Sequence, residues 1–506
     1  MFKQKENREK TKKKEITGND LASIINQAKK SSDFTSFSPS VQEEKIFISY
    51  YMSLVDSEII QKVLLPSIIA KIDEIQSLTE LEAIIPLENM SVTSEEKDIK
   101  VKLNRGFIFI QFYKNDSKGL LINLKNAETG TRQSNDTENE FSVVGPKVGF
   151  VENLQTNIFL LRQKFVASNL VFEEITVGDI SKTKIAIAYL DGITNPQYID
   201  TVKERLNSVN LGVVYDSSHI DQVITDNSFS VFPLFLSTER VDRATYCLEL
   251  GQVAILCDGS PYIITAPSTL FDFFISPEDY YLPWVMGSFL RIIRIFSVFF
   301  SLFSTAAYVA ILTFHYEVIP QDLLGPLISS RINVPFPPVL EVIFLELTIE
   351  LLREAGARLP TKVGQTLGIV GGIVIGQASV EAALTSSVLL IVVSLSALAS
   401  FTTPIFKMSN TIRLIRFPLI LLAAMWGGLG IIVGTIIILA HLMRLKSLGN
   451  PYMVPFYPFR IKNLGDTIIR SSYDRSKKRP DYLRTLKKFR FKPNPKKDIK
   501  EGLDNE

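Results

Sequence analysis

The longest stretch without charge is the feature that most constrains this chain. The run Ile295–Phe314 holds twenty consecutive residues with no acidic or basic side chain. As a helix it would be about 30 Å long, which matches the hydrocarbon core of a bilayer. Charged residues recur every few positions from Met1 to about Pro283, and they become rare from Ile295 to Met443. The sequence therefore predicts an integral membrane protein with a mostly soluble front half.

The composition shifts along the chain divide it into six parts. The fold class we expect is a front half of two small α/β subdomains followed by an all-α, multi-span membrane domain. The predicted parts are a disordered polar arm (1–42), a first α/β subdomain (43–125), a linker (126–142), a second α/β subdomain (143–283), a transmembrane domain (284–443) and a basic cytoplasmic tail (444–506).

Local patterns place helices and strands in the front half. Strands are predicted at 46–53, 105–113, 119–125, 173–178 and 182–192, and a hairpin at 252–267. Helices are predicted at 58–72, 196–209, 219–224 and 240–251. Asp56 and Ser57 offer an N-cap to the first of these helices, which contains an internal Pro66.

The number of membrane crossings stays open at four or five. After the first span, Val363–Thr403 is long enough for two spans with a tight turn, and Phe417–Met443 for one more. The helical segment Pro338–Arg358 carries six charges and fits a re-entrant or interfacial position better than a span. Four spans place the tail beside the N-terminal half, but they also put Lys407, Arg413 and Arg416 outside, against the positive-inside rule.

Charge and cysteine content exclude several classes of protein. The net charge is only +2, and no basic patch is interleaved with stacking aromatic residues, so we expect no nucleic-acid partner. Two cysteines are too few for a disulfide framework and fit a reducing compartment. No apolar segment follows the basic start of the chain, so the N-terminus is expected in the cytoplasm. In the tail, Lys and Arg are more than twice as frequent as Asp and Glu; the tail either binds anionic lipid or simply fixes orientation.

Glycine spacing is the strongest local pattern in the membrane half. Gly364, Gly368, Gly372 and Gly376 recur at every fourth position. On a helix they form one groove without side chains, against which another backbone can pack closely. The groove predicts either an oligomer seam or pore-lining helix, or ordinary packing within one bundle.

Polar side chains near the membrane are the candidates for an ion path. Glu346 and Glu350 share one face of the 338–358 helix, and in a symmetric oligomer either would form a ring of carboxylates. The alternative is an interfacial helix whose acids pair with its own arginines. Gln377 and Glu381 share a face in an apolar run, and they line a pore or make an interhelical hydrogen bond.

Catalysis has little support in the sequence. The three histidines lie in unrelated segments, neither cysteine has metal-ligand spacing, and no phosphate-binding glycine loop or nucleophile elbow is present. We therefore expect no catalytic, cofactor-binding or metal-binding residues.

At this point the residues show a resemblance to a known family. The stretch 334–387, VPFPPVLEVIFLELTIELLREAGARLPTKVGQTLGIVGGIVIGQASVEAALTSS, is its most specific part. Supporting pieces are GPKVGFVENLQTNIFLLRQ (145–163), QVAILCDGSPYIITAP (252–267), SPEDYY (276–281) and ALASFTTP (397–404). From about residue 45 to 470 the chain resembles the A subunits of the GerA-type spore germinant receptors of endospore-forming bacteria. A relative encoded with the stage V sporulation genes shares this architecture and stays an alternative.

The resemblance implies a receptor complex in the inner membrane of the spore. Its partners would be a transporter-like B subunit that senses the nutrient and a lipoprotein C subunit, besides membrane lipids and further copies of this chain, forming a pentamer. It implies a nutrient-gated cation channel. The alternatives are a scaffold that holds the B and C subunits without forming the pore, and, more weakly, a carrier, for which no inverted repeat of the glycine-rich segment is found.

Overall fold

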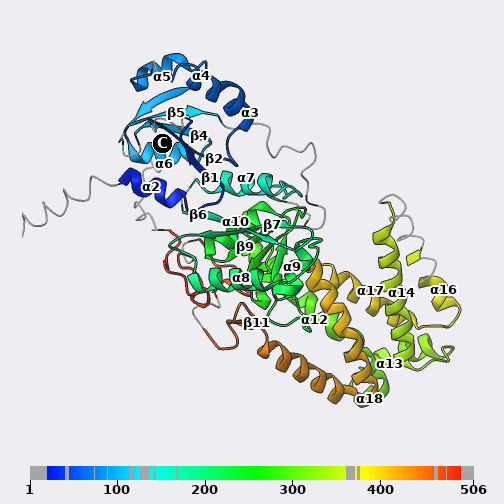
Figure 1. Cartoon of the computed structure of the whole chain (residues 1–506). Coiled ribbons are helices and arrows are strands. Elements are labelled where there is room, and N and C mark those ends of the chain that lie inside the picture. Colours follow the sequence, from blue (N-terminus) through cyan, green and yellow to red (C-terminus); the bar gives the residue numbers. More distant parts are fainter. Residues whose placement is uncertain are drawn as a thin grey trace, which may run out of the picture.

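Two α/β units and a helical half make up the protein (Figure 1). The computed structural model describes residues 20–39, 45–72, 75–87, 89–113, 116, 118–124, 137, 140, 144–166, 169–360, 371–372, 376–460, 465–473 and 476–491.

The first unit is an antiparallel five-stranded sheet, ordered β1-β2-β4-β5-β3, with helices packed on it. Its elements are α2 (Asp20–Ala28), β1 (Phe34–Phe37), β2 (Ile46–Tyr51), α3 (Ser57–Ile59), the π-helix η1 (Ile60–Leu64), α4 (Leu65–Ile69), α5 (Leu78–Ile84), β3 (Met90–Thr93), α6 (Glu96–Leu103), β4 (Phe107–Phe112) and β5 (Gly119–Asn123). Asp56 caps α3 as predicted, since its carboxylate accepts from the backbone N–H groups of Glu58 and Ile59.

The second unit is also an antiparallel five-stranded sheet, ordered β6-β7-β9-β10-β8. Its elements are α7 (Leu154–Lys164), β6 (Leu170–Val177), β7 (Thr183–Leu190), α8 (Pro196–Ser208), α9 (Ser217–Ile224), β8 (Leu236–Thr238), α10 (Val241–Leu250), β9 (Val253–Cys257), β10 (Ile263–Ala266), the 3₁₀ turn η2 (Leu270–Phe273) and α11 (Glu278–Tyr281). The predicted hairpin is β9–β10, paired in register from Leu256↔Ile263 to Val253↔Ala266.

The disordered arm predicted for residues 1–42 is wrong for its second part. Residues 20–28 form α2, and Phe34–Phe37 pair with β2 as the edge strand β1. Leu21 and Ile25 of α2 pack on the apolar cluster shared by the two sheets. Nine residues give too short an apolar pattern to detect, and the partners that order them lie far away in the chain.

The helical half is described by α12 (Trp284–Phe314), the 3₁₀ turn η3 (Tyr316–Val318), α13 (Gln321–Arg331), α14 (Pro338–Arg358), α16 (Gly376–Glu381), α17 (Ser387–Ser400) and α18 (Phe406–Arg444). Two of these described helices, α12 and α18, are long and apolar enough to cross a membrane. Large apolar side chains such as Phe296 of α12 and Leu429 of α18 point outward, at 67% and 69% exposure. Large apolar side chains therefore lie on the outer surface of the helical bundle as well as in its interior.

The segment Phe417–Met443, predicted as one span, instead contains the turn of a helical hairpin. It covers the end of the first arm, the turn at Gly427 and nearly all of the second arm. At Gly427 the backbone leaves the helical region (φ 57°, ψ −134°), and α18 folds back on itself (Figure 1). A side chain at Gly430 would overlap the carbonyl of Leu422 on the other arm, so the two arms pack backbone to backbone. A window of hydropathy does not detect such a reversal, because both arms are equally apolar.

The other helices run along this hairpin. The tip meets the far end of α12, where His315 Nε2 accepts from the Gly428 N–H at 3.1 Å. The α17 helix runs antiparallel to α12: Ser386 lies beside Tyr308, and Ser396 donates to the Ser301 carbonyl at 3.1 Å.

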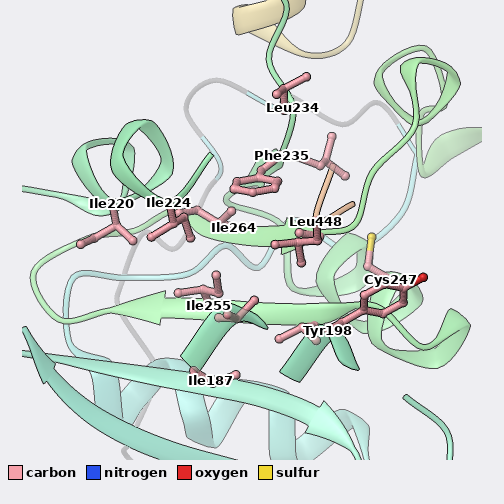
Figure 2. Packing of buried hydrophobic residues seen from close by; sticks show 14 of the residues in the cluster. Ile187, Tyr198, Ile220, Ile224, Leu234, Phe235, Cys247, Ile255, Ile264 and Leu448 are labelled. Atoms are coloured by element: carbon pink, nitrogen blue, oxygen red, sulfur yellow. The ribbon is translucent and has the colours of Figure 1, made fainter. Parts of the chain in front are cut away.

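Both ends of the α18 hairpin are embedded in the core of the second α/β unit. Ile405, Met408 and Ile412 from its start and Leu442 from its end belong to one cluster of buried apolar residues with Ile220. In Figure 2, Leu448, which follows α18, lies among Ile224, Ile264 and Phe235. The α/β unit and the base of the helical bundle thus share one core.

The tail is not simply a polar extension. After α18, the short strands β11 (Lys446–Ser447) and β12 (Asn450–Pro451) pair, and the 3₁₀ turn η6 is Asp481–Leu483. Tyr482 and Leu483 are buried beside Leu250 at the end of α10. Arg490 pairs with Glu249 at 2.8 Å. The chain from 465 to 491, where described, therefore forms a strap along the second α/β unit.

Candidate functional site

Glu346 lies inside the helical bundle, in an ion pair with Arg416 of α18. Both Glu346 oxygens accept from Arg416 Nη1, at 2.6 and 2.8 Å. Arg416 Nη2 also donates to Ser301 Oγ of α12 at 2.5 Å. The two side chains are 5% and 2% exposed, so this pair ties α14 to α12 and α18. The sequence predicted the acid but not its partner.

Glu341 is a second buried acid that the sequence did not propose. It is 1% exposed, accepts from Arg331 of α13 at 2.8 Å, and accepts from the Ser386 N–H at the start of α17 at 3.1 Å. It lies on another face of α14 from Glu346, and both are covered because the first half of α14 is packed on two sides. Glu341 therefore joins three helices at the far end of the bundle.

The second half of α14 is different, because its acids are accessible. Glu350 is 42% exposed in its side chain and pairs with Arg353, while Glu354 pairs with Arg358 at 2.5 Å and is 62% exposed. These are the pairs along the helix that the sequence allowed. Leu351 on this part of α14 is 70% exposed, so its face of the helix is open.

Gln377 and Glu381 are also exposed, and they lie together as predicted from their spacing. Gln377 Nε2 donates to Glu381 Oε1 at 2.9 Å, along α16. This is a bond within one helix, not between helices. Both side chains are thus available to a group outside the protomer.

The predicted glycine groove is only partly within the described structure. Gly364 and Gly368 lie outside the described residues. A side chain at Gly372 would meet nothing within 4 Å, and one at Gly376 would make ordinary contact with Leu390 at 3.6 Å. The close approach required by glycine within this protomer occurs instead in α18, at Gly427, Gly430 and Gly434. The spacing GGLGIIVG at 427–434 is the sequence signal for this close approach.

The base of α12 is anchored through one buried carboxylate. Asp279 of α11 is fully buried and accepts from Arg291 Nε at 3.1 Å and from two nitrogens of Arg294 at 3.1 and 3.2 Å. Arg291 also donates to the carbonyl of Asp466 in the strap at 2.9 Å. From sequence these arginines indicated only the orientation of the span. In the structure they join α12, the α/β unit and the strap.

Removing the charge of Asp279 should release this anchor. Asp279→Asn leaves two buried guanidinium groups with a much weaker acceptor, and we expect a loss of about 3–5 kcal/mol of stability. The measurement is limited proteolysis of the full chain in detergent, where cleavage near the start of α12 should accelerate. The exposed Asp322→Asn on α13 is the control and should change stability by less than about 0.5 kcal/mol. Equal proteolysis of the Asp279 variant and wild type would rule out the anchor.

A second anchor joins the hairpin to the α/β unit. Lys407 at the start of α18 donates to Asp221 of α9 at 2.6 Å, and Thr411 donates to the Val231 carbonyl at 2.8 Å. Lys407 therefore lies against the α/β unit.

The two cysteines behave as packed core residues. Cys247 and Cys257 are free and buried, and burial raises the pKa of each thiol to about 12. In the part of the chain that the structure describes, no three His, Cys, Asp or Glu side chains gather as a metal site.

Comparisons with known proteins extend over most of the chain. Residues 22–482 match the family described as Bacillus/Clostridium GerA spore germination protein. The spore germination protein GerQA of Bacillus cereus is 46% identical over 473 residues, which cover 94% of each chain. Spore germination protein A1 of Bacillus subtilis is 37% identical over 91% of this chain and 95% of its own.

A solved structure also matches part of the chain. It is the N-terminal domain of the A subunit of the Bacillus megaterium spore germinant receptor GerK3, with 25% identity and a TM-score of 0.37, covering 49% of this chain and 94% of that one. The family match and the long, highly identical relatives lead to one conclusion: this chain belongs to the GerA family of spore germination proteins.

Proposed function

We propose that this chain is the A subunit of a nutrient-responsive germinant receptor in the inner membrane of the spore, and that copies of it assemble, as a pentamer, into a nutrient-gated cation channel. The role in germination rests on the family. The channel rests on one observation: α14 and α16 expose Glu350, Gln377 and Glu381 in a helical half whose long helices α12 and α18 carry large apolar side chains on their outer faces.

The two kinds of acid on α14 suit two different tasks. Glu341 and Glu346 are buried and paired between helices, so they hold the protomer together. Glu350 is accessible, and its partner Arg353 is on its own helix. Repeated around a symmetry axis, Glu350 would form a ring of carboxylates that favours cations. We therefore assign the ion path to Glu350, Gln377 and Glu381 and give Glu346 a structural role within each protomer.

The helix directions support a four-crossing arrangement. In it, α12 and the first arm of α18 lead away from the α/β unit, and α17 and the second arm lead back. The α/β unit and the strap then lie on one side, in the cytoplasm by the positive-inside rule. The α17 helix has 14 residues, or about 21 Å, so it crosses only with the help of its flanking segments.

The shared core supports control of the pore by the α/β unit. Because both ends of the α18 hairpin pack in that unit, a rearrangement there must move the hairpin. Nutrient recognition by a transporter-like B subunit, with a lipoprotein C subunit, would act by stabilising one state of this assembly.

The test is nutrient-dependent cation flux in vesicles containing the A, B and C subunits. Glu350→Gln should lower cation conductance several-fold, because a ring of charges is neutralised, while the complex stays intact in a pull-down. Glu58→Gln, on an exposed pair of the first unit, is the control. A complex that binds nutrient but passes no ions would instead favour a scaffold, and flux unchanged by Glu350→Gln in an intact complex would remove Glu350 from the ion path.

Gly372 offers a sharper test of assembly. A Cβ at Gly372 would meet nothing within 4 Å among the described residues, so we expect the single chain to fold with a leucine there. If the glycine groove is an oligomer seam, Gly372→Leu should prevent assembly. In contrast, Gly371→Leu collides with Leu352 of the same protomer and tests folding. Normal assembly and flux of Gly372→Leu would remove the groove from the seam.

A further inference from the structure

A cavity of about 370 Å³ lies between the second α/β unit and the strap. Its walls include Arg243 and Tyr246 of α10, Tyr280 of α11, and Arg470 and Tyr473 of the strap. The volume is within the range of about 300–1,000 Å³ found for small-molecule sites. None of the proposed ion-path residues Glu350, Gln377 and Glu381 lines it.

Aromatic rings and guanidinium groups alternate along one wall. The rings of Tyr246 and Tyr280 are 4.9 Å apart, and their hydroxyls are 3.0 Å apart. Arg490 lies 5.1 Å from the centre of the Tyr246 ring, and Arg470 lies 5.4 Å from that of Tyr280 and 5.2 Å from that of Tyr473. Such a wall offers flat apolar surface beside positive charge.

The cavity is lined by the bases Lys164, Arg243, Arg470 and Arg490 and by the acids Asp242, Glu249 and Asp272. The Asp272 carboxylate accepts from the Thr269 N–H at 2.8 Å. Glu249 forms an ion pair with Arg490 at 2.8 Å, and Asp242 forms one with Arg240 at 2.7 Å. Among the lining bases, Arg243 comes no nearer to a carboxylate than 3.9 Å, at Glu140, and the described residues give Arg470 no ion pair.

Arg470 is the clearest sign of a missing partner. It is 2% exposed, its terminal nitrogens donate only to the carbonyls of Leu282 and Tyr280, and its Nε has no acceptor in the described structure. Buried charged and polar groups normally have partners, because leaving them unpaired is costly.

We propose that this cavity binds a small organic anion, with its carboxylate or phosphate group at Arg470 and Arg243 and its apolar body against Tyr246 and Tyr280. The strap that closes the cavity also holds Arg291 of α12 through Asp466. A bound anion would therefore tie the strap more firmly to the α/β unit at the base of a membrane helix. The inference goes beyond the proposed channel and does not depend on it.

The test uses the full chain in detergent, with Tm measured against three probes: benzoate, the uncharged benzamide, and inorganic phosphate. Benzoate should give a saturable rise in Tm of about 1–2 °C, and benzamide none. A rise with phosphate as well would identify phosphate-bearing ligands as a second source of the same chemistry. No rise with either anion, or an equal rise with benzamide, would overturn the proposal.

Variants connect the response to this cavity. Arg470→Gln should abolish the rise with benzoate. Because this change could also loosen the strap, Thr245→Phe on α10, which fills the cavity without removing charge, should abolish it at an unchanged starting Tm. Lys478→Gln, on the exposed face of the strap, should keep the full response. A full response in Thr245→Phe would place the anion elsewhere.

Discussion

Replacing Glu346 with leucine is expected to cost about 3–5 kcal/mol of stability, because Arg416 is then left charged and buried with only Ser301 as a side-chain acceptor. Arg416→Leu should cost a similar amount by leaving the carboxylate alone. The double variant should recover most of the loss, because replacing both members of a buried pair by apolar groups is often close to neutral. Thermal unfolding of the full chain in detergent measures all three.

The same helix provides the control for this double-mutant cycle of Glu346 and Arg416. Glu354→Gln breaks an exposed pair with Arg358 two turns further along α14, and it should change stability by less than about 0.5 kcal/mol. If the two single variants at Glu346 and Arg416 lose stability additively, the two residues do not interact. If the double variant is stable but its flux in vesicles differs from that of wild type, Glu346 has a role in the ion path besides its structural one.

The regular parts of the α/β half could be predicted from sequence, because their signals are local. The strands β4 and β5 alternate around a polar turn, and β9–β10 turn at Asp258–Pro261. The N-terminal strand β1 could not be predicted, since four residues carry little pattern and its partners come later in the chain. The same holds for the strap, whose charged composition hides the buried Tyr482 and Leu483.

The sequence predicted which acidic side chains belong to the candidate site, but not the residues with which they form ion pairs. Periodicity placed Glu346 and Glu350 on one face of α14, yet one is buried against Arg416 and the other is exposed. The difference arises because α18 and α12 cover only the first half of α14. Such coverage depends on the reversal at Gly427, which hydropathy alone does not reveal.

The junction between the two α/β units depends on another buried pair that the sequence did not indicate. Arg162 of α7 donates from Nε and Nη2 to the two oxygens of Asp33, each at 2.6 Å. Ser31 and Ser53 donate to the same carboxylate, and the Arg162 guanidinium lies 3.9 Å from the centre of the Tyr51 ring. Asp33 and Arg162 are each 1% exposed. The N-terminal segment is therefore ordered by a residue 129 positions away.

Arg162→Met should therefore separate the edge of the first unit from the second. We expect a loss of about 3–5 kcal/mol, together with faster hydrogen exchange in β1 and β2, because Asp33 is left buried with only hydroxyl partners. Lys30→Met is the matched control: it removes an exposed pair with Asp191, at 2.7 Å, that also connects the N-terminal segment to the second unit. That variant should lose no more than about 1 kcal/mol.

The pKa of Asp33 determines how the stability difference between Arg162→Met and wild type changes with pH. Burial alone would raise the pKa of Asp33, but the Arg162 guanidinium and the Ser31 and Ser53 hydroxyls together outweigh burial and hold the pKa below its ordinary value of 3.8. In wild type the carboxylate thus stabilises the fold at pH values above 3.8, and this contribution is lost as the pH falls through the lower folded-state pKa. In Arg162→Met only the Ser31 and Ser53 hydroxyls still oppose the effect of burial, so the pKa rises and the charged carboxylate destabilises the fold as the pH increases. The difference in stability between the two proteins should therefore widen from acid toward neutral pH, and a difference independent of pH would show that Asp33 and Arg162 do not interact as a charged pair.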